Sequence, residues 1–499
     1  MKRKRHTGGR GFLRYAFLRP HQLPPPGPDR GDIVNGGAPV LKYIALWLRD
    51  RLIKSKSLNA TRIVAGSFAV IILVGAVLLT LPVASRDGQS AGFFTALFTA
   101  TSSTCVTGLI LVDTAVQWTL FGQVVILAMI QLGGLGFMTV ITLISFALRR
   151  RIGLSERLVM VSTFNLNDMD GVVRVVRHAL MGTFLLEGAG AVLLAIRFIP
   201  DYGVLRGIWH AIFHAVSAFC NAGFDLAGGK YGAFSSLAGY NSDPLVLAVT
   251  AFLVIVGGLG FFVWEDLVAK KRWKTLSVYS KMVLLITAGL LIAGALFFFV
   301  EEYENPATLG NMPLWQKWLN AAFQSATLRT AGFDAIGQGG LSESSKAMST
   351  ILMLIGGSSG STAGGIKTAT VAVLLLALRA NLRGREQVTF RGRAIPFGQV
   401  LNAMTLTLVV LFVFLIASMV ISTVEGLPYL NCAYEVASAM GTVGLTTGIT
   451  PELTRISQSI LIVLMYLGRV GILSFSIALM TGKRRPAKLH YPEINVMIG

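Results

Sequence analysis

Charged side chains are scarce in this sequence: they make up 14% of its 499 residues, whereas hydrophobic residues make up 53%. A soluble protein of this length needs far more charge to cover its surface. Several apolar runs also reach about 18 residues or more, the length that crosses ~30 Å of hydrocarbon. The scarcity of charge therefore excludes a soluble protein and predicts an all-α, polytopic membrane protein.

Residues that carry enzyme or metal chemistry are few as well. The three cysteines, Cys105, Cys220 and Cys432, are widely spaced and odd in number, which favours neither a disulfide framework nor a zinc site. Of six histidines, only His210 and His214 share a helical face, and no third metal ligand accompanies them. No phosphate-binding G-x-x-x-x-G-K-[ST] sequence is present. A membrane-embedded enzyme is thus a weaker alternative, and no metal is expected beyond a transported ion.

The net charge of +20 is unevenly distributed along the chain. Of 44 lysines and arginines, 34 lie in the first 62 residues and in four later clusters that fall in alternate loops. These clusters span residues 149–177, 270–281, 379–393 and 483–488. Basic residues in alternate loops mark the cytoplasmic side of a membrane protein. The distribution disfavours a nucleic-acid partner and predicts that both termini are cytoplasmic, with lipid as a neighbour.

The apolar runs predict eight transmembrane spans, near residues 63–82, 118–148, 175–199, 244–268, 281–300, 346–379, 398–424 and 456–481. A shorter semi-apolar segment lies between the two spans of each successive pair. These segments are Phe93–Thr104, Ile208–Phe219, Leu314–Leu328 and Tyr429–Met440. Each is too short to cross a bilayer as a helix. Re-entrant helices that enter from the outside fit their length and position.

Each short segment runs into a tract of small residues that ends in a glycine. These glycines, Gly108, Gly223, Gly332 and Gly444, follow one another at intervals of 115, 109 and 112 residues. A near-constant period indicates an internal repeat. We therefore expect four in-line, non-identical repeats around one central pore, at residues 61–150, 151–270, 271–395 and 396–482. A cytoplasmic basic tail, 1–60, precedes them and a cytoplasmic tail, 483–499, follows.

The four glycine loops have the composition of a cation filter. Rings of backbone carbonyls replace the water shell of a potassium ion, and glycine permits the unusual backbone that points carbonyls inward. Ordinary helix-packing glycines would not recur at a common period. The predicted potassium filter consists of Val106, Thr107, Gly108, Asn221, Ala222, Gly223, Thr330, Ala331, Gly332, Thr442, Val443 and Gly444. No loop ends in Gly-Tyr-Gly, so we expect a simpler filter that sodium enters more easily.

This arrangement resembles the Ktr/Trk/HKT superfamily of potassium transporters. The matching motifs are T-G-L at 107–109, F-C-N-A-G-F-D at 219–225, R-T-A-G-F-D at 329–334 and G-T-V-G-L-T at 441–446. Trk-type chains carry two further N-terminal spans, so the chain looks most like the Ktr-type membrane subunit. The resemblance implies sodium-dependent K⁺ uptake across a bacterial-type cell membrane. It also implies a homodimer on a cytoplasmic RCK-type ring whose subunits, rather than this chain, bind a nucleotide.

The sixth span is interrupted by a tract that cannot be a stable helix interior, since ten residues include five glycines. A loop there would lie beneath the filter, and the resemblance implies an intramembrane gating loop. The predicted gate consists of Gly356, Gly357, Ser358, Ser359, Gly360, Ser361, Thr362, Ala363, Gly364, Gly365, Lys367 and Arg469. A kink or helix contact is the alternative for the tract. Arg469 would either face the pore, bind loop carbonyls or join two spans.

We also assign expected roles to other polar residues near the loops. Arg329 is expected to point away from the ion path. Asp113, Asp225 and Asp334 would either attract cations to the outer mouth or form ordinary turns. Glu435 is expected to support the filter from behind. A secondary symporter with coupled transport is the other alternative, which the parallel orientation of the repeats disfavours.

Overall fold

The computed structural model describes residues 60–136 and 172–471. The predicted tails, 1–60 and 483–499, lie outside this part of the chain apart from Ala60. So does the basic cluster at 149–177 apart from its last residues. The two-stranded hairpin near residue 390 is the only sheet among the described residues, and nearly all other regular structure is helical.

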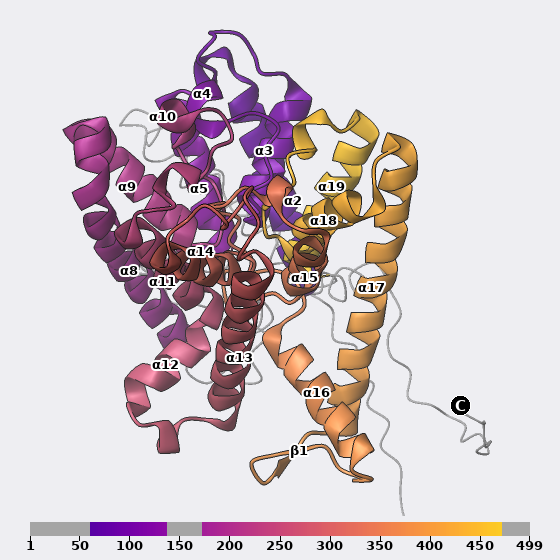
Figure 1. The fold of residues 1–499 in the computed structure, drawn as a ribbon. Coiled ribbons are helices and arrows are strands. Elements are labelled where there is room, and N and C mark those ends of the chain that lie inside the picture. The colour runs from indigo at the N-terminus through magenta and orange to yellow at the C-terminus, as the bar shows by residue number, and fades with distance from the viewer. Residues whose placement is uncertain (1–59, 137–171, 472–499) are drawn as a thin grey trace, which may run out of the picture. The chain divides into compact units, whose positions relative to one another are not determined.

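Three kinds of helix recur in the same order four times (Figure 1). The first is a long outer helix: α2 (Ala60–Thr80), α8 (Val172–Tyr202), α13 (Val278–Glu301) and α17 (Phe397–Glu425). The second is a short helix: α3 (Phe93–Cys105), α9 (Val204–Phe219), α14 (Leu314–Thr327) and α18 (Tyr429–Gly441). The third is a closing helix: α5 (Leu120–Leu135), α11 (Pro244–Leu259), α15 (Glu343–Leu354) and α19 (Arg455–Val470).

The remaining elements connect or extend these helices. The helical ones are α4 (Thr114–Gln117), α10 (Gly228–Tyr231), α12 (Phe261–Lys270), α16 (Thr368–Leu382), η1 (Pro82–Ala84), η2 (Ala238–Tyr240), η3 (Trp273–Thr275), η4 (Gln338–Gly340) and η5 (Thr450–Glu452). Strands β1 (Thr389–Phe390) and β2 (Arg393–Ala394) pair antiparallel between α16 and α17. The all-α class and the four short helices predicted from the sequence are confirmed.

Within the described residues, three helices are long and apolar enough to cross a membrane: residues 177–202 of α8, α13 and α17. A fourth span is formed if α11 and α12, which meet at an angle of 96°, are counted together. Three of the other four expected spans appear as shorter apolar helices: residues 64–80 of α2, α5 and α16. Their hydropathy is as predicted, but the closing helices do not run straight through the expected segments.

Side-chain caps set where three of the closing helices begin. The Thr119 hydroxyl accepts from the backbone N–H of Gly122, and the Ser342 hydroxyl accepts from that of Ser345. The Asp243 carboxylate accepts from the first N–H groups of α11, which Pro244 opens at a position where its missing N–H costs nothing. The caps fix the register of these helices relative to the loops that precede them.

Three of the four closing helices end or bend at a glycine. Gly136, Gly260 and Gly471 follow α5, α11 and α19 with φ of 80°, 89° and 90°, a region that disfavours side chains. In the third repeat, residues 355–367 form a loop between α15 and α16. The expected fourth span is therefore bent, because the φ of Gly260 redirects the chain at that point.

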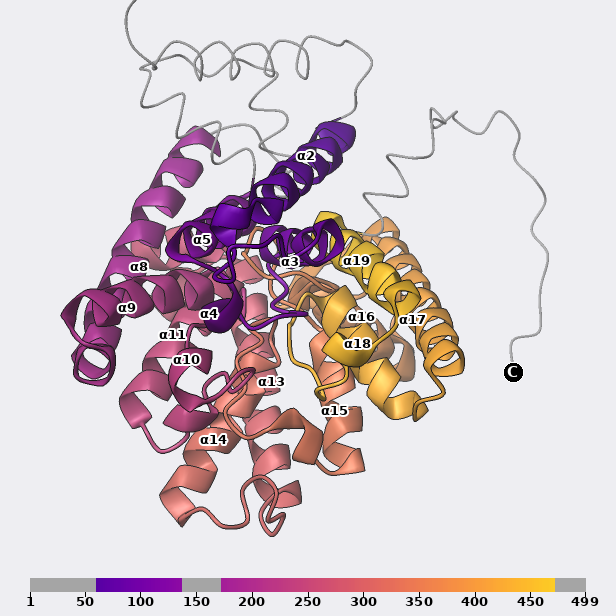
Figure 2. The ribbon, with the colours of Figure 1, turned by 90° about the horizontal axis from the view of Figure 1, so that it is seen from above.

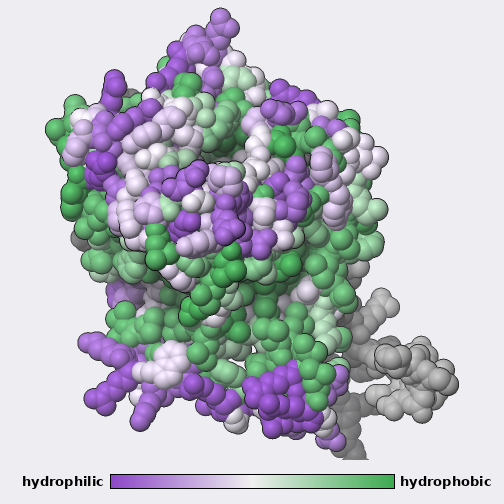
Figure 3. Space-filling view, in the orientation of Figure 1, coloured by the Kyte–Doolittle hydropathy of each residue, from purple (hydrophilic) through white to green (hydrophobic). Residues whose placement is uncertain are grey.

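The four helix triplets are arranged in chain order around a common centre (Figure 2). Each closing helix packs against the short helix of the next repeat: α5 on α9, α11 on α14, α15 on α18, and α19 on α3. The last contact closes the ring between the end of the chain and its beginning. Figure 3 shows a band of hydrophobic side chains across the lower middle of the face, with hydrophilic ones gathered at the end that carries α12, α16 and β1 and mixed over the upper part.

Candidate functional site

The four predicted filter loops share one backbone conformation. In each loop the residue two places before the glycine lies in the left-handed region: Val106, Asn221, Thr330 and Thr442 have φ of 58°, 59°, 67° and 52°. The glycines themselves have φ of 97°, 71°, 82° and 96°. A non-glycine residue at positive φ is uncommon. Its recurrence at one position of four unlike sequences shows that the repeats build the same loop.

Backbone N–H groups of the loops point back toward the short helices. The N–H of Thr107 donates to Ser102 O at 2.8 Å, and that of Val443 donates to Ser438 O at 2.8 Å. The hydroxyls of the same serines accept from the N–H of Gly108 and Gly444 at 3.0 Å. In repeats two and three, the N–H groups of Ala222 and Ala331 donate to Ser217 O and Thr327 O. With the donors held outward, the carbonyls are left to face inward.

The glycines close into a ring with the carbonyls of neighbouring repeats. A Cβ placed on Gly108 would lie 2.6 Å from Ala222 O, and one on Gly223 would lie 2.8 Å from Ala331 O. A Cβ on Gly332 would strike Val443 O, and one on Gly444 would strike Thr107 O. The order runs from repeat one to two, three, four and back to one. Only glycine fits at the four positions, because each carbonyl occupies the space of a side chain.

The chemistry of the ring suits a partly dehydrated cation. Among the described residues, no hydrogen bond ends on the carbonyl oxygens of Thr107, Ala222, Ala331 or Val443. These residues are fully buried, and the hydroxyls of Thr107 and Thr442 have no partner in the described part of the chain. The loops also follow the C-terminal ends of four short helices, where the helix dipole is negative. Oxygen atoms and negative dipole ends therefore converge on one place.

Arg329, three residues before Gly332, does not enter this ring. Its guanidinium donates to the carbonyl of Gly356 at 3.1 Å, in the loop between α15 and α16. The prediction that it points away from the ion path agrees with this contact. On the other side, the Asn221 amide donates to Arg329 O at 3.2 Å. Neighbouring loops are thus joined through polar side chains behind the carbonyl ring.

The predicted gate tract forms a loop that packs against the second filter loop. The Thr362 hydroxyl contacts the carbonyl of Phe219 at 3.2 Å and the Asn221 side-chain oxygen at 3.0 Å. A Cβ on Gly364 would strike the Thr442 side chain, so the loop also touches the fourth filter loop. The Lys367 ammonium donates back to Ala363 O at 2.7 Å. The loop is therefore held close to the ring by two of the four repeats.

The break in the second repeat forms a socket for this loop. The N–H of Ser358 donates to Gly258 O and the N–H of Phe261 donates to Gly360 O, both at 3.0 Å. A Cβ on Gly260 would lie 2.6 Å from the Ser358 hydroxyl and 2.8 Å from Ser359 O. The glycine at the α11–α12 bend thus permits close backbone contact between the second and third repeats.

Arg469 joins the loop to the first repeat. Its guanidinium donates to Thr362 O in the loop and to the carbonyls of Gly133 and Gly134 at the end of α5. Of the three roles that the sequence left open, the structure favours pairing with loop carbonyls. One cation from the fourth repeat therefore bridges the third repeat and the first.

The acidic residues near the loops have structural partners. Asp113, Asp225 and Asp334 each accept from backbone N–H groups two residues further on, which supports the turn interpretation. Glu435 accepts from the Thr447 N–H at 2.8 Å and from the hydroxyls of Thr446, Thr447 and Thr450. It thus braces the segment that follows the fourth filter loop.

The His214 ring contacts the Thr250 hydroxyl at 3.0 Å and packs on Phe333.

Comparison with known families identifies the class of protein. The family model of TrkH, described as "Cation transport protein", matches residues 40–484. The chain belongs to this family. The resemblance predicted from the four glycine motifs is therefore confirmed, and the family is one of transport proteins rather than enzymes.

Several relatives of the TrkH family match over nearly their whole length. The potassium/sodium uptake protein NtpJ of Enterococcus hirae is 42% identical over 89% of this chain and 98% of its own. Ktr system potassium uptake protein B of Bacillus subtilis is 39% identical over 90% and 99%. The crystal structure of the potassium transporter TrkH from Vibrio parahaemolyticus superposes with a TM-score of 0.65, at 18% identity and 86% coverage of both chains. This last match shows the fold.

One functional feature was missed in the sequence, although its signal is present there. Residues 133–136 and 257–260 both read G-G-L-G, and residues 468–471 read G-R-V-G. The last glycine of each motif ends a closing helix. Aligning the three motifs would have predicted these breaks, and would have placed Arg469 where Gly134 and Gly258 stand in the first two repeats.

Proposed function

We propose that this protein takes up potassium across the cell membrane through a filter made by the twelve residues named above. The observation that carries the proposal is the closed order in which each glycine abuts a carbonyl of the next repeat. Such a ring supplies oxygen ligands from four backbones and no full charge in the ion path. The names of the two bacterial relatives, a potassium/sodium uptake protein and a potassium uptake protein, agree with it.

The loop at 355–367 and Arg469 act as the gate in this proposal. The contacts of Thr362, Gly364 and Arg469 place the loop against two filter loops and tie it to the first repeat. In this position the loop obstructs the ion path at the point where it leaves the filter. We further propose that sodium stimulates uptake, that two copies form a homodimer, and that a separate cytoplasmic RCK-type subunit binds a nucleotide and releases the loop. Similarity to a Ktr system protein supports these parts.

A matched pair of glycine substitutions tests the filter. Gly444 and Gly448 have nearly the same φ, 96° and 100°, so serine strains both backbones alike. A side chain at Gly444 strikes Thr107 O in the ring, whereas Gly448 has open space around it. We expect Gly444→Ser to lower the preference for potassium over sodium about tenfold, the effect of ~1.4 kcal/mol of lost coordination. Rubidium uptake into liposomes, competed by each cation, measures this preference.

Gly448→Ser serves as the control and should keep the selectivity of the unmodified protein. Equal loss in both variants would mean that backbone strain, and not the ring, sets the preference. Unchanged selectivity in a folded Gly444→Ser protein would contradict the proposed filter. Thermal unfolding of both variants shows whether they are equally folded.

A further inference from the structure

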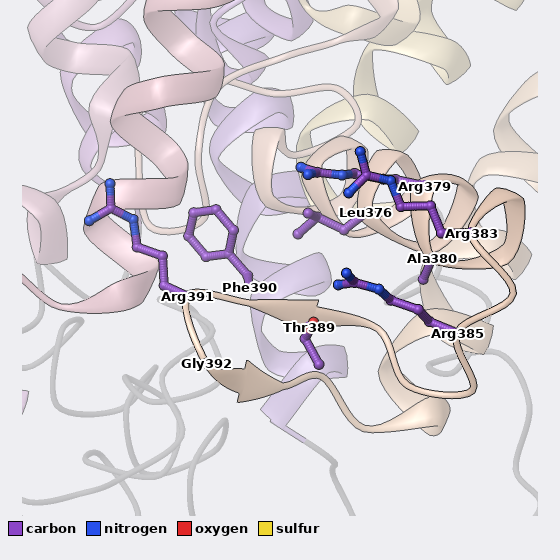
Figure 4. Close-up of a pocket in the computed structure, with 9 residues that line it drawn as sticks. All are labelled: Leu376, Arg379, Ala380, Arg383, Arg385, Thr389, Phe390, Arg391 and Gly392. Carbon is purple, nitrogen blue, oxygen red and sulfur yellow. The ribbon is translucent and has the colours of Figure 1, made fainter.

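The end of α16 remote from the filter carries a pocket lined by arginines. Helix α16 runs from the loop at 355–367 to the hydrophilic end of the described chain, where the β1–β2 hairpin follows it (Figures 1 and 3). The cavity there has a volume of 380 Å³. Its lining consists of Leu376, Arg379, Ala380, Arg383, Arg385, Thr389, Phe390, Arg391 and Gly392 (Figure 4).

The local backbone folds so as to bring these arginines together. Arg379 and Arg383 are one helical turn apart at the end of α16. Gly384, with φ of 62°, reverses the chain, and the N–H of Arg385 donates to Ala380 O at 2.9 Å. This glycine-based helix end returns Arg385 to the side of Arg379. Figure 4 shows the three side chains extending toward Leu376 and Phe390.

A tight hairpin completes the wall of the pocket. Thr389 pairs with Ala394 and Phe390 with Arg393, and the turn residues Arg391 and Gly392 both have positive φ. These angles are those of the two-residue turns that suit twisted hairpins. The hairpin holds the Phe390 ring opposite the arginines, so the cavity has an apolar side and a cationic side.

The arginines of the pocket lack acidic partners in the described part of the chain. No ion pair or side-chain hydrogen bond there involves Arg379, Arg383 or Arg385. Some exposed cations elsewhere do have them: Lys230 lies 2.9 Å from Asp201 and Lys270 lies 2.6 Å from Asp266. The helix dipole favours cations at the end of α16, but it does not account for the folded-back Arg385 or for the hairpin that covers the group.

The surroundings of the pocket place it at a membrane surface. Leu375, Leu378 and Leu382 lie along one side of α16 and are 52%, 56% and 78% exposed. Phe397, the first residue of α17, is 79% exposed. The guanidinium carbon of Arg391 lies 5.9 Å from the centre of the Trp273 ring. Exposed leucines beside a tryptophan and arginines are typical of the boundary between hydrocarbon and headgroups.

We propose that this pocket binds the phosphate of an anionic phospholipid headgroup, with the acyl chains along the exposed leucines of α16. Guanidinium groups bind phosphate through paired, charge-assisted hydrogen bonds. Three such groups without carboxylates form a site for an anion and exclude the transported cation. A soluble phosphate compound has the same chemistry, but it would not use the adjoining apolar surface. The site is separate from the filter and does not depend on its assignment.

Lipid binding to the purified full-length protein tests the proposal. Native mass spectrometry counts the bound molecules of phosphatidylglycerol and of phosphatidylcholine with the same acyl chains. We expect Arg379→Gln/Arg383→Gln/Arg385→Gln to weaken phosphatidylglycerol binding at least about tenfold, given the contribution of each basic residue near an anionic surface. Phosphatidylcholine binding should be weaker in the unmodified protein and should change little.

A control removes the same charge from the same end of the molecule. Lys271→Gln/Arg272→Gln/Lys274→Gln changes three exposed residues outside the pocket and should alter binding by less than about twofold. Equal loss in both variants would overturn the proposal in favour of general surface charge. Displacement of the lipid by excess inorganic phosphate would overturn the membrane source. Unchanged lipid binding with loss of a co-purifying soluble subunit would instead make the pocket a protein-docking surface.

Discussion

Arg469 shows how much one residue does at this site. It stands in G-R-V-G at a position where the related motifs of the first two repeats have glycine. Its guanidinium contacts carbonyls of Thr362, Gly133 and Gly134, which belong to two other repeats. A cation within a membrane span is costly unless it is paired. Here the carbonyl oxygens are the partners, and the charge lies close to the proposed ion path.

We expect Arg469→Gln to raise the rate of rubidium uptake about tenfold in the absence of a regulatory subunit. The substitution removes a positive charge and weakens the charge-assisted hydrogen bonds that hold the loop, and a net loss of ~1.4 kcal/mol corresponds to a tenfold change. Uptake into liposomes at a fixed protein density measures the rate. Arg455→Gln, at the exposed first residue of the same helix, is the control and should leave the rate unchanged.

A different result would assign Arg469 another role. The Arg469→Gln protein could take up rubidium more slowly and still unfold at the same temperature as the unmodified protein. In that case the guanidinium supports the open path and does not hold a gate. If it unfolds well below that temperature, the residue joins the repeats structurally.

At the scale of single residues, the sequence predicted which residues belong to the candidate site better than it predicted the atoms that they contact. The glycine period predicted the four glycines that abut carbonyls of neighbouring repeats, whereas the assignment of all twelve residues to a potassium filter stays a prediction. Charge alone indicated that Arg329 points away from the ring. The partners of Arg469 were not predictable, because Gly133 lies more than three hundred residues away along the chain. Contacts between distant backbones leave no local pattern in the sequence.

Among the elements, the bent closing helix of the second repeat also forms the contact surface for a loop of the third repeat. Helices α11 and α12 meet at 96°, and their junction receives the loop from the third repeat. The loop is therefore held both by hydrogen bonds to this junction and by the bridge between Ile355 and Ile366 at its own base. Such elements lie at the less stable end of a protein and are suited to movement.

We expect Gly260→Ala to loosen this loop. A methyl group there would lie 2.6 Å from the Ser358 hydroxyl and would force the backbones apart. Hydrogen exchange of residues 355–367 should become faster, and uptake without a regulatory subunit should rise several-fold, by about 1 kcal/mol of lost restraint. Gly232→Ala is the control, since Gly232 also has positive φ but has open space around it. Slower exchange in Gly260→Ala would contradict the socket.

The length of each element was more predictable than its path. Segments of 12 to 15 residues between longer apolar runs indicated re-entrant helices, and α3, α9, α14 and α18 have nearly those bounds. The breaks after α5, α11 and α19 were not predicted. Hydropathy stays high through G-G-L-G, because glycine and leucine are apolar, and the change lies only in the sign of φ.

For the molecule as a whole, the proposed orientation follows from the basic loops. The three native cysteines are buried, so a single introduced cysteine reports on its own position. We expect a membrane-impermeant maleimide to label Asn311→Cys in intact cells, because the exposed loop between α13 and α14 faces outward. Glu386→Cys, in the exposed turn after α16, should be labelled only after lysis. The reverse pattern would contradict cytoplasmic termini.

The overall architecture followed from two simple sequence properties, the scarcity of charge and the spacing of four glycines. The boundaries of the repeats, the homodimer, the RCK-type ring and the sodium dependence stay predictions. They depend on surfaces and partners that the filter glycines do not encode.

Because the four repeats belong to one chain, each side chain occurs only once around the pore. A pore made of four identical subunits would place four copies of Arg469 around its axis. At about 5 Å, neighbouring guanidinium groups would repel one another by ~3 kcal/mol per pair, and the stacked charge would exclude the transported cation. Tandem linkage lets a single copy be added while the related positions stay glycine. If Arg469 acts in the proposed gate, its single copy thus limits the positive charge that closure places in the ion path.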